Sequence, residues 1–387
     1  MITRDDIREL ANFRSPEGCA VTFYYQPSTP LNKSHREEII QVKDMIRSAL
    51  REAEKNGKNG STRGDLERIA SMIDPLHGNG KAKAIFACSK EGFWREFDIP
   101  AQLLQSRIGV SQRFRLKPLA AVLDGEQRAC IVLADRTKAR AFELVNDDIR
   151  EKLDFVNELT RRGKSDGWSG YDAGHAERKQ MNEALQHFKT IADYIEHYFE
   201  RETQARLVIG CRDDVWSEIE PELQAQGRQH LIGRFRIDPK LATPEQVKQM
   251  AREQLLEHSA NMKQALIREV IGEAHRNGRG AIGLRRVLRS LELGEALTLL
   301  MGSSFSAPGV KCYNCGHMDL HDSPTCAVCG KENTQLEDIG DAIVGHAIRT
   351  GVELVYIPDD EEFDRIGRIA ALLRFRADQN TPAKAAS

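Results

Sequence analysis

The sequence predicts an α/β protein with three domains, each a mixed or parallel sheet covered by helices, and a zinc-ribbon insertion in the third domain. Three observations support this prediction. Short apolar runs typical of buried strands alternate with longer segments in which apolar residues recur at helical spacing. The length of 387 residues suffices for two or three domains of ordinary size. Two Cys-x2-Cys pairs follow one another near the C-terminal end.

The first predicted domain comprises residues 1–125 and forms one α/β unit. Its elements are expected as a helix over 4–13, a strand over 18–26, a helix over 34–55, a second long helix over 65–76, and two antiparallel strands over 81–89 and 91–100. We expect Asp65 or Ser61 to cap the second long helix, because both side chains can accept from unpaired backbone N–H groups. Between these two helices, residues 54–64 contain three glycines and form a basic hairpin tip.

The second predicted domain comprises residues 126–272. It opens with a strand, a turn at Asp135–Lys138 and a second strand, all within 128–144. Its further elements are expected as a sheet-edge strand over 149–156, a helix over 175–198, a buried strand of the parallel type over 205–211, a helix over 214–225, a strand over 231–238 and a long helix from Pro244. This alternation predicts a three-layer α/β domain.

A glycine-rich basic loop over residues 161–180 interrupts the second domain. Glycine recurs there at positions 163, 167, 170 and 174, so no regular element is expected to persist. Its basic and aromatic side chains include Arg161, Arg162, Lys164, Trp168 and Arg178. Such a loop before a helix N-terminus can contact phosphate groups or RNA. Two alternatives stay open, namely an ordinary solvent loop and a Trp168 that packs against its own domain.

The third predicted domain comprises residues 273–378, and a disordered tail over 379–387 follows it. Residues 283–301 have helical spacing with a break at Gly294. Further elements are expected as a helix over 341–351 that ends on Gly351, a strand over 352–358, and a final segment over 366–378 that starts loose and ends in a strand.

The zinc-ribbon insertion spans residues 310–332. Its candidate ligands are Cys312, Cys315, Cys326 and Cys329. Each Cys-x2-Cys pair can form a knuckle, and Gly316 and Gly330 stand where each knuckle needs a tight turn. Four thiolates make a closed tetrahedral site, so the predicted zinc is structural rather than catalytic. The alternatives are an iron–sulfur cluster or a reduced empty site, and His317 or His321 could replace a cysteine ligand.

Composition predicts a cytoplasmic protein with no membrane and no DNA partner. No apolar run is long enough to span a bilayer, and the N-terminus has no apolar signal-peptide core. The formal net charge of −2 argues against a protein that coats nucleic acid indiscriminately. Two basic segments without acids, 107–117 and 276–289, are either solvated faces or RNA contacts. Four isolated cysteines are expected to be buried, reduced thiols: Cys19, Cys88, Cys130 and Cys211.

Together these parts resemble the archaeal and eukaryotic class I peptide-release factors and Pelota, the stalled-ribosome factor. In the third domain the resemblance rests on GLRRVLRSLELGEALTLL (283–300), on the paired Cys-x2-Cys insertion and on GVELVYIPDDEEFDRIGRIAALLRFRAD (351–378). In the second it rests on ACIVLADRTKARAFEL, the glycine-rich loop and ARLVIGC. The first domain is similar in layout to the codon-reading domain of release factors. The chain therefore resembles a bacterial homologue of that family.

Two motifs of the family are missing. Release factors carry Gly-Gly-Gln in the central loop, where this chain has GWSGYD (167–172), and the stop-codon motif Asn-Ile-Lys-Ser is missing from residues 54–64. The resemblance therefore implies a ribosome-binding factor that occupies the aminoacyl-tRNA site without peptide release, as in ribosome hibernation. Rescue of stalled ribosomes and peptidyl-tRNA hydrolysis are the alternatives.

The resemblance also implies partners and contact residues. The tip residues Lys55, Lys58 and Arg63 would contact rRNA at the decoding centre. The loop residues assigned to the peptidyl-transferase region, by phosphate pairing and base stacking, are Arg161, Arg162, Lys164, Trp168 and Arg178. The third domain would face a GTPase translation factor such as elongation factor Tu.

Two hypotheses of other classes remain beside this one. An enzyme that cleaves peptidyl-tRNA or RNA would draw on Ser169, Asp172, His175 and Glu177. Their spacing defines no pair of nucleophile and base, and a mobile loop opposes the preorganisation that catalysis needs, so we expect no enzymatic activity. A zinc-stapled adaptor that binds only proteins is the third hypothesis, and such a protein would not sediment with ribosomes.

Overall fold

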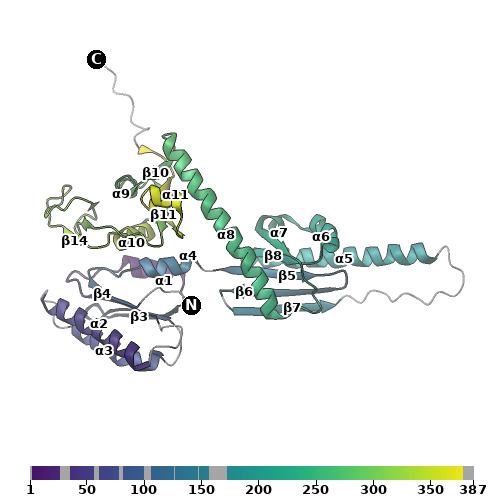
Figure 1. Cartoon of the computed structure of the whole chain (residues 1–387), viewed down its shortest axis with the longest axis horizontal. Coiled ribbons are helices and arrows are strands. Elements are labelled where there is room, and N and C mark those ends of the chain that lie inside the picture. Colours follow the sequence, from purple (N-terminus) through teal and green to yellow (C-terminus); the bar gives the residue numbers. More distant parts are fainter. Residues whose placement is uncertain are drawn as a thin grey trace, which may run out of the picture. The chain divides into compact units, whose positions relative to one another are not determined.

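The computed structural model describes residues 2–26, 35–55, 61–77, 82–99, 106–125, 127–146, 148–156 and 172–377. The chain folds into two compact units (Figure 1). Unit 1 combines residues 1–125 with 265–387, and unit 2 comprises residues 126–264. None of the helices in the described part of the chain combines the length and the apolar composition that a bilayer crossing requires.

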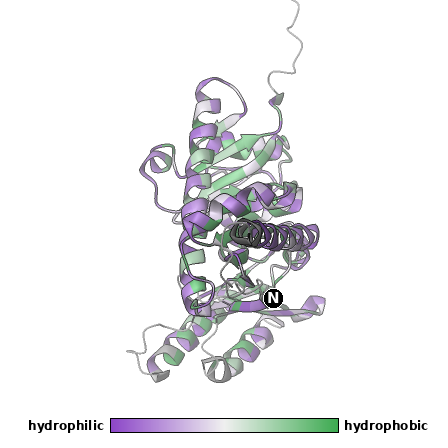
Figure 2. Cartoon of the chain, turned by 90° about the vertical axis from the view of Figure 1, so that its right-hand side faces the viewer, coloured by the Kyte–Doolittle hydropathy of each residue, from purple (hydrophilic) through white to green (hydrophobic). Residues whose placement is uncertain are grey.

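The N-terminal half of unit 1 is an antiparallel sheet of order β3-β2-β1-β4 with helices on both faces. Its elements are α1 (Arg4–Asn12), β1 (Ala20–Tyr25), α2 (His35–Lys55), α3 (Ser61–His77), β2 (Ala82–Cys88), the 3₁₀ turn η1 (Ser89–Glu91), β3 (Phe93–Ile99), β4 (Arg107–Ser111) and α4 (Lys117–Asp124). Residues of β1 alternate between two cores: Phe23 packs with α2 and α3, whereas Tyr24 packs on the opposite face. Figure 2 shows the amphipathic pattern of α2 and α3, which alternate purple and green.

Most predicted elements of this half are confirmed, one strand was not predicted, and the Asp65 capping expectation is wrong. Residues 107–111 form β4, an edge strand, whereas their charge pattern gave no strand signal. The helix α3 begins at Ser61, so Asp65 does not cap it. Asp65 is instead buried and accepts hydrogen bonds from the backbone N–H and the hydroxyl of Ser89.

The C-terminal half of unit 1 contains a sheet of order β10-β16-β11-β15 and the three short strands of the ribbon. Its elements are the end of α8 (Pro244–His275), β10 (Gly280–Ile282), α9 (Leu284–Glu292), β11 (Ala296–Gly302), β12 (Gly309–Lys311), β13 (Met318–Asp319), β14 (Thr334–Leu336), α10 (Gly340–Thr350), β15 (Glu353–Ile357), α11 (Glu361–Arg365) and β16 (Ile369–Leu373). The helix α10 ends on Gly351 in the left-handed conformation, as predicted.

The helical expectation for 283–301 is wrong in its second part. The helix α9 ends at Glu292, Gly294 adopts a φ of 69°, and Ala296–Gly302 forms the strand β11. The strand lies between β16 and β15, and both of its faces are covered, because Leu299 and Leu300 belong to different cores. A strand buried on both sides is a continuous apolar run, which periodicity alone does not separate from a helix.

The two halves of unit 1 share one hydrophobic core. Tyr24, Phe86 and Leu119 from the first half pack in the same cluster as Met301 and Ile343 from the second. Sequence order does not reveal this packing, because it joins the two ends of the chain. Whether residues 1–125 and 273–378 fold as separate domains therefore stays a prediction.

Unit 2 is a five-stranded sheet of order β7-β6-β5-β8-β9 between helices. Its elements are β5 (Arg128–Ala134), β6 (Lys138–Val145), β7 (Asp148–Val156), α5 (Asp172–Arg201), β8 (Arg206–Gly210), α6 (Asp213–Ile219), the 3₁₀ turn η2 (Glu220–Glu222), α7 (Ala225–His230), β9 (Leu231–Phe235) and the first part of α8. One face packs against α5 and α6, and the other against α8. The predicted edge position of β7 and the parallel pairing of β8 with β5 are confirmed.

One helix expectation in unit 2 is wrong in its extent. Residues 214–225 were expected to form a single helix, but α6 ends at Ile219 and the 3₁₀ turn η2 follows. Pro221 lies in that turn and has no backbone N–H to continue an α-helix. The four isolated cysteines are buried, as predicted.

Candidate metal centre and charged clusters

The four ribbon cysteines converge at one point. Their Sγ atoms all lie within 4.8 Å of one another, and among the described residues they form the cluster suited to a metal ion. The strand β12 lies between β13 and β14, so the first knuckle starts at its end. Two of the thiols are buried, Cys312 and Cys326, whereas Cys315 is exposed. The cluster could therefore hold a metal close to the surface of unit 1.

The two knuckles repeat the same backbone geometry. The Cys312 N–H donates to the His317 carbonyl at 2.9 Å, and the Cys326 N–H donates to the Lys331 carbonyl at 2.7 Å. The predicted glycines close the turns, with a φ of 85° at Gly316 and 69° at Gly330. Only glycine adopts such angles readily. In the second knuckle the Val328 N–H donates to the Cys326 Sγ, with 3.4 Å between nitrogen and sulfur.

Each ribbon histidine has its Nδ1 atom in contact with a carboxylate. The Nδ1 atom of His317 lies 2.6 Å from a Glu292 carboxylate oxygen, which also accepts from the Met318 N–H at 3.1 Å. The Nδ1 atom of His321 lies 3.3 Å from Asp319. Neither ring belongs to the thiol cluster. The four cysteines thus form a closed ligand set without a fifth donor, and Glu292, at the end of α9, anchors the first knuckle to the body of unit 1.

The structure describes only some of the predicted RNA contacts. Five of these residues lie outside the described part of the chain: Lys58, Arg161, Arg162, Lys164 and Trp168. Lys55 is the last residue of α2, and its side chain is not described. Arg63 is exposed on α3 and pairs with Glu67 at 2.8 Å. The loop expectation for 161–180 is wrong at its C-terminal end, because α5 begins at Asp172. Arg178 is exposed on this helix. Their assignment as RNA contacts stays a prediction.

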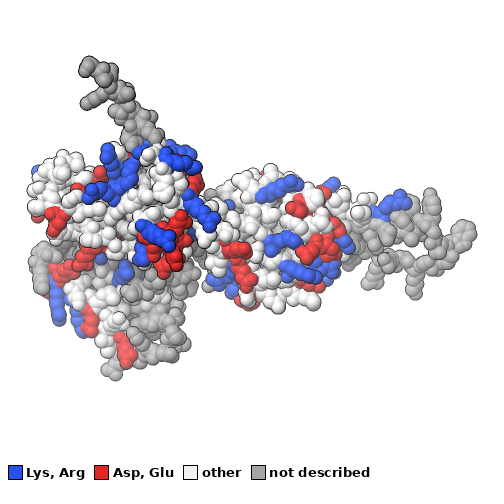
Figure 3. All heavy atoms as spheres, turned by 45° about the horizontal axis from the view of Figure 1, so that its top comes forward, with Lys and Arg blue, Asp and Glu red and all other residues white. Residues whose placement is uncertain are grey.

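The side chains of the candidate catalytic residues are likewise not described. Asp172, His175 and Glu177 belong to the first turns of α5, and their side chains, like all of Ser169, lie outside the described part of the chain. The expectation of no enzymatic activity therefore rests on the sequence. Figure 3 shows that blue and red side chains are interspersed over the drawn face, which agrees with the low net charge.

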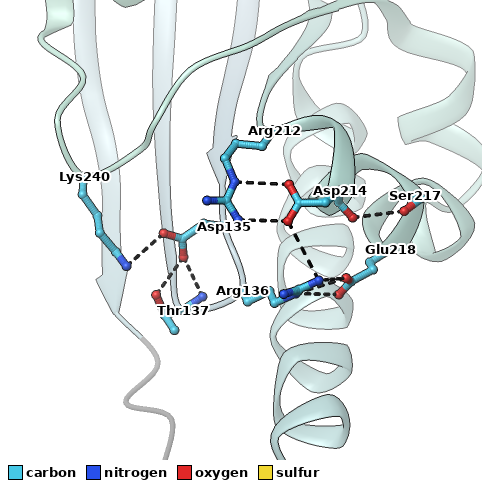
Figure 4. Close-up of polar contacts among 8 residues, drawn as sticks. All are labelled: Asp135, Arg136, Thr137, Arg212, Asp214, Ser217, Glu218 and Lys240. Carbon is cyan, nitrogen blue, oxygen red and sulfur yellow. Dashed lines mark hydrogen bonds and ion pairs between the residues drawn. The ribbon is translucent and has the colours of Figure 1, made fainter.

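A charged network in unit 2, missed by the sequence analysis, joins the ends of β5 and β8 (Figure 4). Arg136 pairs with Glu218 and lies 4.0 Å from Asp214, which also accepts from Arg212 at 2.9 Å. The carboxyl ends of parallel strands are common ligand sites. Here the acids are neutralised by arginines, and the Arg212 hydrogen bond lowers the pKa of Asp214. The network therefore closes this edge of the sheet rather than offering a general acid.

Asp135 holds the turn between β5 and β6 in the same network. Its Oδ1 accepts from the N–H groups of Thr137 and Lys138, each at 2.6 Å, and its Oδ2 lies 3.2 Å from Lys240 Nζ. Burial alone would raise the pKa of Asp135, but these donors outweigh it and the pKa lies below the ordinary value. The turn predicted at Asp135–Lys138 is thus confirmed, with an anionic carboxylate at its centre.

Replacing Asp135 by asparagine is expected to make unit 2 less stable at neutral pH by roughly 1–3 kcal/mol, because hydrogen bonds to a charged group are lost. A lowered pKa contributes stability above the unfolded value of about 3.9, and this stability is lost as the pH falls through the folded value. Urea unfolding at pH 7 and at about pH 3 should show a difference between wild type and Asp135→Asn that shrinks in acid. The exposed Glu200→Gln variant is the control, and an equal difference at both pH values would contradict the prediction.

One comparison with known proteins, the match to a family model, agrees with the predicted resemblance. Residues 115–279 match the model of bacterial archaeo-eukaryotic release factor family 10. No curated protein matches the chain. Among solved structures, Archaeoglobus fulgidus Pelota is 12% identical, with 97% of this chain and 93% of that chain covered and a TM-score of 0.36. Ribosome-bound archaeal Pelota, from a complex with ABCE1, is 13% identical over 97% and 94%, with a TM-score of 0.43. Dom34 of S. cerevisiae is 9% identical over 79% and 84%, with a TM-score of 0.41.

The chain is thus an α/β protein with a four-cysteine ribbon. Over residues 115–279 it is similar to the bacterial relatives of archaeal and eukaryotic release factors. The predicted resemblance to that family is confirmed over this segment, which includes all five strands of the unit 2 sheet and the helix α5.

Proposed function

We propose that the protein is a ribosome-associated translation factor that occupies the aminoacyl-tRNA site without releasing the peptide, and that its role is ribosome hibernation. The observation that carries the proposal is the match of residues 115–279 to the bacterial release-factor family. That segment contains the loop that corresponds to the catalytic loop of release factors, together with the sheet and the helix that flank it.

Binding without peptide release is supported by the chemistry of this segment. The loop has GWSGYD (167–172) in place of Gly-Gly-Gln, so the glutamine that positions water is missing. In the charged network of unit 2, the pKa values of Asp135 and Asp214 lie below their ordinary values. Neither carboxyl can serve as a general acid near neutral pH.

Basic residues at two places in the chain would make the RNA contacts. Lys55, Lys58 and Arg63 would bind the RNA backbone of the decoding centre. The Arg63 ion pair with Glu67 lies at the surface, where the two side chains are 60% and 56% exposed. Ion pairs that are exposed to water contribute little stability, so phosphate can displace the glutamate. In the peptidyl-transferase region, phosphate pairing and base stacking would come from Arg161, Arg162, Lys164, Trp168 and Arg178.

The remaining parts have supporting roles. Zinc would be the metal of the four-cysteine cluster, because four thiolates in two Cys-x2-Cys knuckles form a closed tetrahedral site. The ribbon and the body around it would face a GTPase such as elongation factor Tu. A ribosome-bound factor of this kind works in the cytoplasm.

Ribosome binding is expected to depend steeply on salt. The protein should co-sediment with ribosomes on a sucrose gradient at low salt and dissociate at roughly 0.3 M salt, because phosphate contacts release counterions. Replacing Arg161, Arg162 and Lys164 together by glutamine should lower the slope of log affinity against log salt by about 2. The control replaces three exposed residues elsewhere in unit 2 by glutamine: Lys189, Arg201 and Arg236. A protein that stays at the top of the gradient would support the adaptor hypothesis instead.

The two roles, hibernation and rescue, differ in which ribosomes the protein binds: idle ribosomes in the first case and stalled ones in the second. We expect the protein on ribosomes of resting cells and not on stalled complexes of growing cells. Labelled peptide in a stalled complex should stay bound when the protein is added. Peptide release that disappears in a His175→Ala or Asp172→Asn variant would overturn this proposal in favour of a hydrolase.

A further inference from the structure

A cavity of about 480 Å³ lies in unit 1 beside the metal ribbon. Its walls come from both halves of the unit, where α10 lies against α1 (Figure 1). Four of the lining side chains are cationic: Arg14, Arg113, Lys311 and Arg349. Arg14 follows α1, Arg113 follows β4, Lys311 ends β12 and Arg349 belongs to α10. Residues that are distant in the sequence therefore bring like charges to one place.

These cations have no acidic partner. Within the described part of the chain, no carboxylate oxygen lies within 4.0 Å of a charged nitrogen of any of the four. Lys311 is only 4% exposed, and burial together with the neighbouring Arg349 and Arg113 lowers its pKa to about 7. The one carboxylate of the lining, Glu292, is held by the His317 ring and the Met318 N–H. Cys312 and Cys315 also line the cavity, and a zinc ion held by four thiolates would add negative charge there. The basic side chains are thus only partly compensated.

Helix capping explains part of this arrangement. The Ala11 carbonyl accepts from Arg113 at 3.1 Å and from Arg349 at 3.3 Å, and the Phe13 carbonyl accepts from Arg113 at 3.2 Å. The C-terminal end of α1 would stabilise one cation. Capping gives no role to Arg14 or Lys311. Burial and the neighbouring Arg113 lower the pKa of Arg349 to about 10, as expected where like charges lie close together. Like charges gathered in a poorly hydrated site are costly unless an anion joins them.

We propose that this cavity is a binding site for a phosphate-bearing ligand, whose oxygens take hydrogen bonds from Arg14, Arg113, Lys311 and Arg349. Guanidinium groups match phosphate oxygens in pairs, and a multiply charged anion compensates several cations at once. The volume suits a ligand of nucleotide size, and the half-buried Tyr313 ring in the wall offers a surface for a base. The phosphate belongs either to a free nucleotide or to an RNA backbone. The site does not depend on the proposed ribosome contacts.

The test is a calorimetric titration of the full-length chain, free of ribosomes, with inorganic pyrophosphate, with ADP and with a short single-stranded RNA. We expect saturable binding of pyrophosphate at one site per chain, at least tenfold weaker in Arg14→Gln and in Arg349→Gln. Arg14 is exposed and donates no hydrogen bond to the described residues, so its replacement leaves the fold intact. Arg47→Gln, which removes an exposed arginine from the same unit, is the matched control and should bind like wild type.

The ligands distinguish the two sources of phosphate. Displacement of pyrophosphate by ADP and not by RNA assigns the site to a free nucleotide, and displacement by RNA assigns it to an RNA backbone. Metal content and the thermal unfolding midpoint of each variant show whether it is folded. The proposal is overturned if none of the three ligands binds saturably to wild type, or if folded Arg14→Gln and Arg349→Gln bind pyrophosphate as tightly as wild type.

Discussion

Replacing Cys326 by serine is expected to abolish metal binding and to unfold the ribbon over residues 310–332. Cys326 is the buried ligand of the second knuckle and accepts from the Val328 N–H. In a structural zinc site of this class, metal binding contributes roughly 10–16 kcal/mol to the apparent free energy of folding. The small strands around the cluster bury little apolar surface of their own. Elemental analysis should find one zinc per chain in wild type and none in the variant, and limited proteolysis should cut the variant within the ribbon.

The matched control is Cys19→Ser, because Cys19 is a buried thiol outside the cluster. It should retain one zinc per chain and an intact ribbon. The same proteolytic cut should occur in wild type after treatment with a chelator, since removal of the metal has the same consequence as removal of a ligand. A Cys326→Ser protein that still carries zinc, or a wild-type protein purified with iron instead, would contradict a structural zinc site in this cluster.

Replacing Lys117 by alanine is expected to destabilise unit 1 by about 1.5–3 kcal/mol, because hydrogen bonds of a partly buried charged group are lost. The Lys117 ammonium lies 2.8 Å from an Asp338 oxygen and also donates to the Phe305 carbonyl. Its backbone N–H donates to Asp341 at 3.1 Å, and its carbonyl accepts from the Tyr356 hydroxyl. One residue of α4 thus connects the first half of unit 1 to three segments of the second.

Urea unfolding followed by Trp94 fluorescence measures this effect, in a background with Trp168 and Trp216 replaced by phenylalanine. Lys90→Ala is the contrast, because Lys90 forms an exposed pair with Glu17 in the same unit and its loss should cost little stability. Replacing Asp338 by asparagine in the Lys117→Ala background should recover part of the stability, since the unpaired charge is removed. Equal effects of Lys117→Ala and Lys90→Ala would show that the Lys117 contacts do not hold the halves together.

Local sequence patterns predicted the parts of this molecule that depend on near neighbours. The metal cluster was predictable because each cysteine pair and its following glycine lie within five residues. The turn at Asp135 was predictable for the same reason, since its carboxylate accepts from Thr137 and Lys138, two and three residues further on. The strand β11 was not, because its continuous apolar run has no period that separates a strand from a helix.

The parts that depend on distant residues could not be predicted. Lys117 and Asp338 are separated by 221 positions, and no local pattern indicates their pairing. The same holds for Arg113 and Arg349, which meet at the Ala11 carbonyl. From the acid-free segment 107–117, the sequence predicted only a basic surface or RNA contacts and not the partners of its residues. The structure shows that Lys117 is used in the packing of unit 1, and that Arg113 lines a cavity.

The most direct test of the central proposal is a cryo-EM map of ribosomes isolated with this protein from resting cells. The proposal predicts density for the chain in the aminoacyl-tRNA site, with residues 55–63 at the decoding centre, residues 161–178 near the peptidyl-transferase region and an intact nascent-chain bond wherever peptidyl-tRNA is present. Ribosomes without the protein in that site, or density for it only on the outer surface, would contradict the proposal.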